Sequence, residues 1–154
     1  MLKDILYIVG ISMVPVIELR GAIPVGAGMG VNMWLCLLAA VIGNLIPVPF
    51  LVLFGGKVLR WCAKFEKFGK PFRWILNLGE KKVSKMKKTV FWGLLAFVAI
   101  PLPGTGAWTG SLIAITLGLD LKKSFPPIAL GVLIAGIIMM LGSYGVVALF
   151  EIFK

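Results

Sequence analysis

The sequence predicts an all-α integral membrane protein with two inverted repeats, each a re-entrant helical hairpin plus a transmembrane helix, joined by a basic amphipathic cytoplasmic segment. Three observations lead to this fold class. The 154 residues are 60% hydrophobic and 14% charged, which is too apolar for a water-soluble domain of this size. Eleven of the sixteen basic residues lie between Lys57 and Lys88, the charge asymmetry of a cytoplasmic loop. Proline and glycine also interrupt two of the apolar runs.

The first apolar run, Ile5 to Ile17, is too short to cross a membrane. It reaches about 20 Å as a helix, against a hydrocarbon core of about 30 Å. The charges of Glu18 and Arg20 and several helix breakers follow, and such backbone is tolerated at membrane depth only inside protein or beside a wet cavity. We predict a re-entrant hairpin over Ile5 to Gly30 with its tip at Glu18 to Pro24. No small-residue cleavage site follows the run, so we expect it to stay in the mature protein.

The second apolar run follows Asn32, a good N-cap residue. Met33 to Phe54 is about 33 Å long as a helix, enough for a full span, with a kink expected from Gly43-Asn44 and from Pro47 with Pro49. We expect Gly55-Gly56 to end it. Residues 57–88 then alternate aromatic and aliphatic side chains with lysines and arginines, which indicates amphipathic helices in the headgroup layer. Their role is topology and anchoring, or alternatively guidance of an anionic substrate.

Val90 to Gly118 is also long enough to span, but Pro101-Leu102-Pro103-Gly104-Thr105-Gly106 breaks it in the middle. A second re-entrant hairpin therefore fits better than a straight helix. A short basic turn follows at residues 120–123. Phe125 to Phe150 is a long span with Pro126-Pro127 in its first turn, where proline is tolerated.

The two halves of the chain match each other. Gly30 and Gly118 each precede an aliphatic residue and a capping residue, and Gly43 and Gly131 follow them at the same offset. Aliphatic-Pro and Gly-Ala pairs recur as well: Val14-Pro15 with Ile100-Pro101, and Gly21-Ala22 with Gly106-Ala107. We interpret residues 1–154 as a single membrane domain: repeat 1 over 1–56, the cytoplasmic amphipathic segment over 57–88, and repeat 2 over 89–154.

Charge predicts how the repeats are related. The exit of the first hairpin near Asn32 has no basic residue and should lie outside. The exit of the second carries Lys122 and Lys123 and should lie inside. We therefore expect the repeats to be inverted, with the hairpin tips meeting near the bilayer midplane.

The meeting point is the candidate site. A broken helix directs backbone N–H groups and a positive dipole end toward its break, and we expect half-helices starting near Pro24 and Ala107 to do so. Arg20 would bind a phosphate or carboxylate through its planar fork, with threonine hydroxyls as further donors. The candidate substrate-binding residues are Arg20, Gly21, Pro24, Gly104, Thr105, Gly106, Trp108 and Thr109.

Glu18 is the candidate proton-coupling residue. It lies two positions before Arg20, so the side chains face each other only if the segment is unwound. Glu18 either neutralises Arg20 as a structural ion pair or takes up a proton during transport. The prolines and glycines of the hairpins have a simpler alternative role, which is to shape the turns.

Composition argues against several other classes. Histidine is absent, and with it most metal sites and general bases. Cys36 and Cys62 have no spacing that suits a metal or a disulfide framework. We expect no cofactor, no metal, no enzymatic activity and no nucleic-acid partner.

A resemblance adds to this interpretation. Glu18-Leu19-Arg20-Gly21-Ala22-Ile23-Pro24 and the later Pro101-Leu102-Pro103-Gly104-Thr105-Gly106-Ala107-Trp108-Thr109-Gly110 together resemble the family of small multidrug export proteins, over essentially the whole chain. That family looks like a compact relative of the DedA/VTT membrane proteins, which have paired re-entrant hairpins and include translocases of undecaprenyl phosphate and scramblases of phospholipids. Residues 100–110 carry no charge here, whereas DedA proteins have arginines around this tip. Only Glu18 and Arg20 are therefore available for the corresponding acidic and basic roles.

These observations predict a multi-pass transporter of the cell inner membrane. It would move an anionic amphiphile, a polyprenyl phosphate or phospholipid, between leaflets, with protons as the coupling ion at Glu18. The alternatives are proton-coupled export of cationic drugs, for which Arg20 is dispensable, and a non-transporting membrane scaffold. We expect membrane lipids as partners, and a homodimer, because two hairpins and two spans are a thin shell for a polar pocket.

Overall fold

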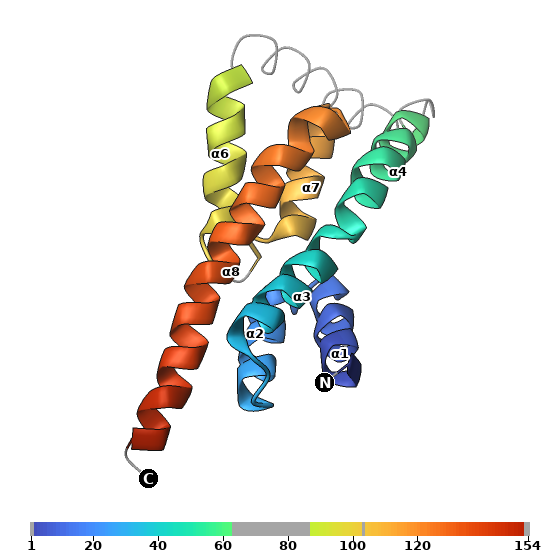
Figure 1. Cartoon of the computed structure of the whole chain (residues 1–154). Coiled ribbons are helices and arrows are strands. Elements are labelled where there is room, and N and C mark those ends of the chain that lie inside the picture. Colours follow the sequence, from blue (N-terminus) through green and yellow to red (C-terminus); the bar gives the residue numbers. More distant parts are fainter. Residues whose placement is uncertain (1, 63–86, 103, 153–154) are drawn as a thin grey trace.

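The structure is a computed structural model that describes residues 2–62, 87–102 and 104–152 (Figure 1). Every regular element in these ranges is a helix, which confirms the all-α prediction for this part of the chain. The helices are α1 (Leu2–Met13), α2 (Glu18–Gly28), α3 (Met33–Leu45), α4 (Pro47–Cys62), α6 (Lys87–Ala99), α7 (Ala107–Thr116) and α8 (Leu121–Ile152).

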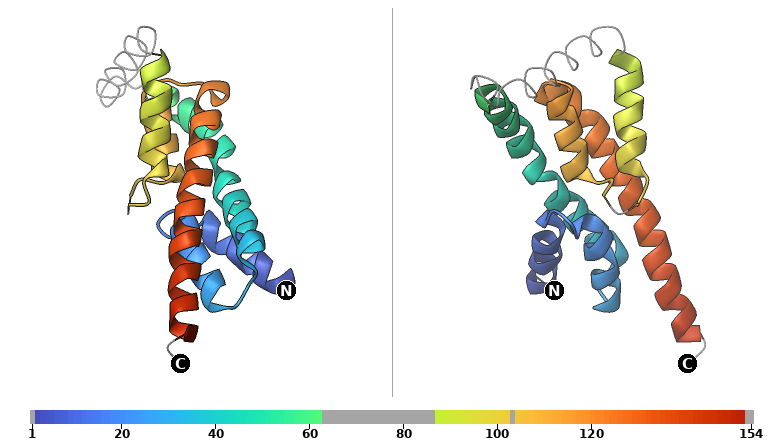
Figure 2. Two further views of the ribbon diagram at one scale, coloured as in Figure 1. Left: turned by 60° about the vertical axis from the view of Figure 1, so that its left-hand side comes forward. Right: turned by 180° about the vertical axis from the view of Figure 1, so that it is seen from behind.

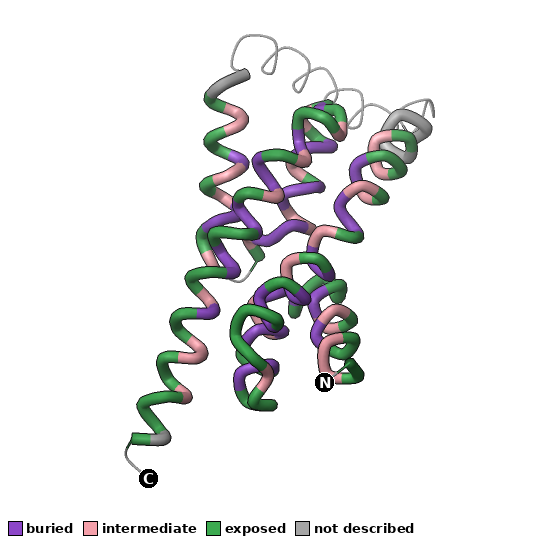
Figure 3. Tube along the Cα trace, in the orientation of Figure 1, coloured by how far each residue is buried: buried purple, intermediate pink, exposed green. Residues whose placement is uncertain are grey.

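Two stretches are long and apolar enough to cross a membrane. They are Met33–Lys57, which runs through α3 and α4, and Leu121–Phe150 in α8. Large apolar side chains are exposed on their outer faces, among them Trp34, Phe50 and Leu141. Buried residues gather where the helices cross, and exposed ones follow the outer faces (Figure 3). An apolar surface of this extent belongs in lipid, so the chain is a membrane protein.

Two helical hairpins lie at opposite ends of the molecule. Helices α1 and α2 form one, α6 and α7 form the other, and their connections face each other in the middle (Figures 1 and 2). Helix α8 runs along both hairpins, while α3 packs on α1 and α4 packs on α7. The two ends of the chain lie at one end of the molecule, and the end of α4 and the start of α6 lie at the other (Figure 2).

Glycines allow close packing at corresponding places in the two halves. A Cβ atom added to Gly43 of α3 would overlap the backbone of Val9 in α1. A Cβ atom added to Gly131 of α8 would lie 2.9 Å from the carbonyl oxygen of Leu95 in α6. In each half, therefore, the first helix of the hairpin packs backbone to backbone on the long helix that follows.

The hairpins also end in the same way. Gly30 after α2 and Gly118 after α7 have φ angles of 71° and 66°, in the left-handed region that favours glycine. The amide of the residue after each glycine bonds to the carbonyl five residues earlier, at 3.0 and 2.9 Å, which closes the helix end. The Asn32 side chain then accepts a hydrogen bond from the amide of Trp34 at 3.0 Å, which confirms the predicted N-cap of α3.

The first hairpin turns earlier than predicted. The chain reverses over residues 14–17, not at Glu18 to Pro24, and α2 already begins at Glu18. The early turn uses Pro15 where no amide is needed, and the Glu18 amide bonds back to the Val14 carbonyl at 3.0 Å. Pro24 lies inside α2 and leaves one helical hydrogen bond unmade, because proline has no amide hydrogen.

Other boundaries also differ. The predicted kink near Pro47 is confirmed, because α3 ends and α4 begins on either side of Ile46. Gly55-Gly56 does not end the helix: α4 continues to Cys62, and a Cβ atom on Gly55 would overlap Ile115 of α7, so this glycine serves helix packing. Helix α8 begins at Leu121 rather than Phe125, because the Asp120 carbonyl starts its hydrogen bonds. The predicted amphipathic segment covered residues 57–88. Residues 57–62 instead continue α4 and residues 87–88 begin α6, while residues 63–86 lie outside the described part of the chain.

Candidate functional site at the hairpin tips

Glu18 links the first hairpin to the second. Its φ angle is 51°, a left-handed conformation that is uncommon for a residue other than glycine. The side chain is buried, with 5% of the residue exposed. Its Oε1 atom accepts a hydrogen bond from the backbone amide of Trp108 at 3.2 Å, in the first turn of α7. A strained backbone persists only where its surroundings hold it, and here the contact with α7 does so.

Arg20 makes the second link. Its Nη1 atom donates to Oε2 of Glu18 at 2.7 Å. Its Nη2 atom donates to the Thr105 hydroxyl at 2.9 Å and to the Ile100 carbonyl at 3.1 Å. The left-handed conformation of Glu18 lets these side chains meet two residues apart, which a regular helix does not allow. The guanidinium therefore ties α2 to the connection between α6 and α7.

Gly106 makes room for the Glu18 carboxylate. A Cβ atom added to Gly106 would overlap all three carboxylate atoms. Its φ of −92° and ψ of −164° suit any residue, so space rather than backbone conformation requires glycine here. We call Glu18, Arg20, Ile100, Thr105, Gly106 and Trp108 the tip junction.

The tip junction contains donors that have no partner. The Nε of Arg20 and the indole Nε1 of Trp108 are buried and make no hydrogen bond within the described part of the chain. Buried polar groups are normally satisfied, and each exception calls for an explanation. Both groups are N–H donors, so what they lack is a hydrogen-bond acceptor.

The structure brings five of the nine predicted site residues together and leaves the other four outside the tip junction. The five are Glu18, Arg20, Thr105, Gly106 and Trp108. Gly21 adjoins Ile17 of its own hairpin, and Gly104 is an exposed turn residue with a φ of 85°. Thr109 is half-buried on α7, but its hydroxyl is not among the groups that bind Glu18 or Arg20. Pro24 is exposed and lines a groove against α8.

One participant in the tip junction was not predicted, and one buried polar residue elsewhere was also missed. The Ile100 carbonyl binds Arg20, and the signal for it was the helix break at the following proline, which frees carbonyls of the preceding turn. The buried polar residue is Asn44 of α3, which does not belong to the tip junction; it is 1% exposed, and its amide oxygen and nitrogen have no partner within the described residues. A lone amide beside Pro47 in an apolar run was the available signal for Asn44.

Three cavities lie on other parts of the molecule. Their volumes are about 210 Å³ between α6 and α8, about 600 Å³ between α4 and the start of α8, and about 560 Å³ between α2 and the later part of α8. Tip-junction residues line none of these three. The structure thus shows the tips in contact with each other, with the Glu18 carboxylate lying at the N-terminus of α7.

The ion pair of Glu18 and Arg20 lies in the first hairpin and is hydrogen-bonded to the second. Together with two apolar stretches long enough to cross a membrane, it defines a helical membrane protein with an internal polar junction. The sequence profile of the family described as "Putative small multi-drug export protein" matches residues 18–138. The chain belongs to this family, as its motifs predicted, and the match begins at Glu18. No curated protein and no solved structure matched the chain. The relationship to DedA/VTT proteins stays a prediction.

Proposed function

We propose that this chain is a membrane transporter that moves an anionic amphiphile, a polyprenyl phosphate or a phospholipid, between the leaflets of the inner membrane. The observation that carries the proposal is the environment of the Glu18 carboxylate. It is held by a guanidinium, that of Arg20, and by a backbone amide at the N-terminus of α7. These are the groups that bind phosphate in proteins, so the carboxylate marks an anion site.

The unpartnered donors favour the same substrate class. The Nε of Arg20 and the Nε1 of Trp108 need acceptors, and a phosphate group supplies several acceptor oxygens. A cationic drug lacks these phosphate oxygens and adds a positive charge near a guanidinium. The buried donors therefore support an anion more than a cation.

The arrangement of the helices supports a transporter with re-entrant hairpins. In this proposal α3–α4 and α8 cross the membrane, while α1–α2 and α6–α7 enter from opposite sides and return. The matching glycines of the two halves, Gly43 with Gly131 and Gly30 with Gly118, support inverted repeats. With residues 57–88 in the cytoplasm, the tips lie near the bilayer midplane.

Glu18 acts in the proposal as an internal competitor of the substrate. While ionised it holds Arg20 and the amide of Trp108, and the tips stay together. Protonation removes the charge, weakens both links and frees the donors for a phosphate headgroup. Release of the proton on the other side would restore the contact, which couples movement of the substrate to the proton gradient.

Two observations favour a second candidate, proton-coupled export of cationic drugs. The family description names multidrug export, and Glu18 is a buried carboxylate that a cation could reach if Arg20 moved away. This candidate requires Glu18 and leaves Arg20 dispensable.

We propose transport rather than catalysis or a scaffold, since the tip junction has no pair of base and nucleophile and a scaffold gives its charges no role. We further propose a homodimer, in which a second copy widens the shell around the site.

A binding experiment separates the two candidates. Purified protein is titrated with farnesyl phosphate, a short polyprenyl phosphate, and with tetraphenylphosphonium, a lipophilic cation, by native mass spectrometry. Arg20→Ala and Glu18→Gln are compared with wild type and with Lys3→Gln, which removes an exposed charge far from the tips. Leaflet exchange of a fluorescent lipid phosphate in proteoliposomes then measures transport by the same variants.

The proposal expects farnesyl phosphate binding to fall at least tenfold in Arg20→Ala and to rise in Glu18→Gln, because the internal carboxylate no longer competes. Lys3→Gln should behave as wild type. If tetraphenylphosphonium binds to wild type, and this binding is kept in Arg20→Ala but lost in Glu18→Gln, the anion proposal is wrong and drug export is favoured. If neither ligand responds to either variant, the tip junction is structural.

A further inference from the structure

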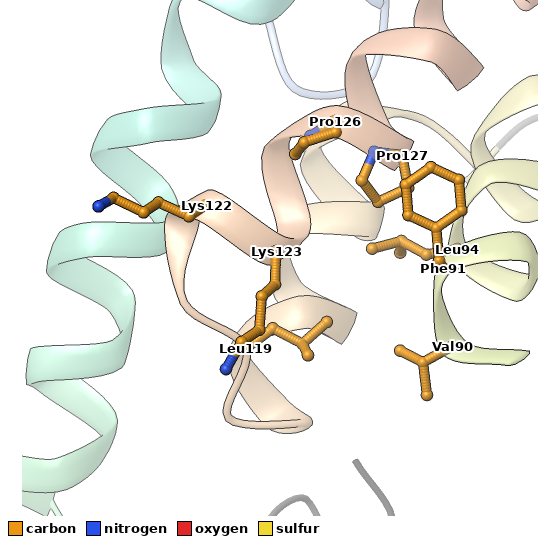
Figure 4. Close-up of a pocket in the computed structure, with 8 residues that line it drawn as sticks. All are labelled: Val90, Phe91, Leu94, Leu119, Lys122, Lys123, Pro126 and Pro127. Carbon is orange, nitrogen blue, oxygen red and sulfur yellow. The ribbon is translucent and has the colours of Figure 1, made fainter. Parts of the chain in front are cut away.

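An apolar slot opens between α6 and α8, far from the hairpin tips. Its volume is about 210 Å³, and its walls are Val90, Phe91 and Leu94 of α6, Pro126 and Pro127 of α8, and Leu119 of the preceding turn. In Figure 4 the apolar side chains stand on both sides of this space, with α6 opposite the start of α8. The slot has the shape and chemistry to hold a hydrocarbon chain.

Two lysines stand at the slot. Lys123 lies beside Leu119, while Lys122 points away from α6 and toward α4 (Figure 4). Lys122 thereby reaches a second and larger cavity, of about 600 Å³, which Lys57 of α4 also lines. The two cavities share Leu119, Lys122 and Lys123, so one turn of the chain forms a wall of both.

The charged side chains around these cavities are mostly positive. Among the residues that the structure describes, Lys57, Lys122 and Lys123 line them together with a single acidic residue, Asp120. The Nζ of Lys123 lies 3.2 Å from Oδ2 of Asp120, but both side chains are more than half exposed, so this pair contributes little. Three lysines against one aspartate leave an excess of two positive charges beside an apolar slot.

We propose that the start of α8 is a binding site for an anionic phospholipid, with one acyl chain in the α6–α8 slot and the phosphate between the lysines. Charge complementarity selects the headgroup. The six apolar residues that line the slot favour a ligand whose headgroup carries a hydrocarbon chain. Basic pockets between transmembrane helices bind anionic headgroups in this way. A free phosphate would leave the slot empty, and a lipid without net negative charge would leave the excess positive charge uncompensated.

This site is separate from the tip junction and does not depend on the proposed transport function. None of its lining residues takes part in the links among Glu18, Arg20 and Trp108. A lipid bound here would join α4, α6 and α8 at one end of the molecule. It is therefore expected to stabilise the folded chain by mass action.

The test compares three ligands on the purified protein: phosphatidylglycerol, phosphatidylcholine with the same chains, and glycerol phosphate, which has no chain. Native mass spectrometry measures binding, and the melting temperature measures stabilisation. The variants are Lys122→Gln/Lys123→Gln, which removes the charge, and Val90→Trp, which fills the slot. Lys3→Gln controls for loss of an exposed lysine elsewhere, and Arg20→Ala keeps this test separate from that of the tip junction.

The proposal expects phosphatidylglycerol to bind wild type at least tenfold more tightly than either of the other two ligands. Lys122→Gln/Lys123→Gln should lose roughly 10- to 30-fold of this affinity, and Val90→Trp should lose it as well. Lys3→Gln and Arg20→Ala should keep it. Equal binding of phosphatidylcholine, or of glycerol phosphate, overturns the proposal. So does equal loss in Lys3→Gln, or retention of full affinity in the lysine double variant. If Val90→Trp fails to fold, Val90→Ser, which makes the slot polar, takes its place with the same expected loss.

Discussion

Gly106→Ala tests the central contact of the tip junction with the smallest possible change. The added methyl group meets the Glu18 carboxylate, which is held by Trp108 and Arg20. Since the backbone angles of Gly106 suit alanine, the main effect is displacement of that carboxylate, with a smaller loss because alanine is a poorer N-cap of α7 than glycine.

The expected cost follows from the bonds that displacement breaks. Hydrogen bonds to charged groups contribute about 1.5–3 kcal/mol each, and two such bonds hold the carboxylate. Loss of one and weakening of the other costs about 2–4 kcal/mol. For a chain of this length each kcal/mol lowers the melting temperature by roughly 2–4 °C, so Gly106→Ala should melt roughly 5–15 °C below wild type.

The assay is thermal unfolding in detergent, with Gly93→Ala as the matched control. Gly93 is exposed in the middle of α6, and a Cβ atom there meets nothing within 4 Å. Its replacement should leave stability within about 1 kcal/mol of wild type or raise it, through the helix preference of alanine. In a Glu18→Ala background, Gly106→Ala should add almost no further loss, because the overlap is gone. Equal melting of Gly106→Ala and Gly93→Ala, or full additivity with Glu18→Ala, would refute the reasoning.

Three further substitutions test other parts of the structure. Arg20→Lys keeps the charge but loses the fork that reaches Glu18, Thr105 and the Ile100 carbonyl together; farnesyl phosphate titration should show about a tenfold loss, and wild-type affinity would mean that charge alone suffices. Asn44→Leu removes a buried amide that has no partner among the described residues and should raise the unfolding free energy by about 1 kcal/mol; a loss of stability would show that the amide is satisfied. Tyr144→Phe removes the hydroxyl that donates to the Val31 carbonyl at 2.6 Å, at a cost of about 1 kcal/mol by thermal unfolding; unchanged melting contradicts that contact.

The tip junction gives the glycines of the second tip separate roles. Gly106 leaves space for a carboxylate from the other hairpin, and Gly104 supplies a left-handed turn. Sequence reasoning assigned both to the substrate because glycine at a helix break suits either purpose. The distinction depends on which side chain arrives from the first hairpin, and that information lies 88 residues away, at Glu18.

The local chemistry of the sequence determined the class of protein and some of the helix limits. Apolar content and the clustered basic residues indicate a membrane protein, and Asn32 caps α3 as its side chain predicts. Pro101 and the residues after it break the second hairpin where expected. These features depend on hydrophobicity, proline and capping, which act within a few residues.

Only the tertiary structure decided how the pieces meet. It closed the first turn before Glu18, because Pro15 and the left-handed Glu18 complete the reversal. It continued α4 through Gly55, where Ile115 of α7 occupies the space that a side chain at this position would need. It also assigned both charges to contacts with the other hairpin, since a buried ion pair is stable only where further donors and acceptors complete it. Such partners lie far apart in the chain, and packing alone brings them together.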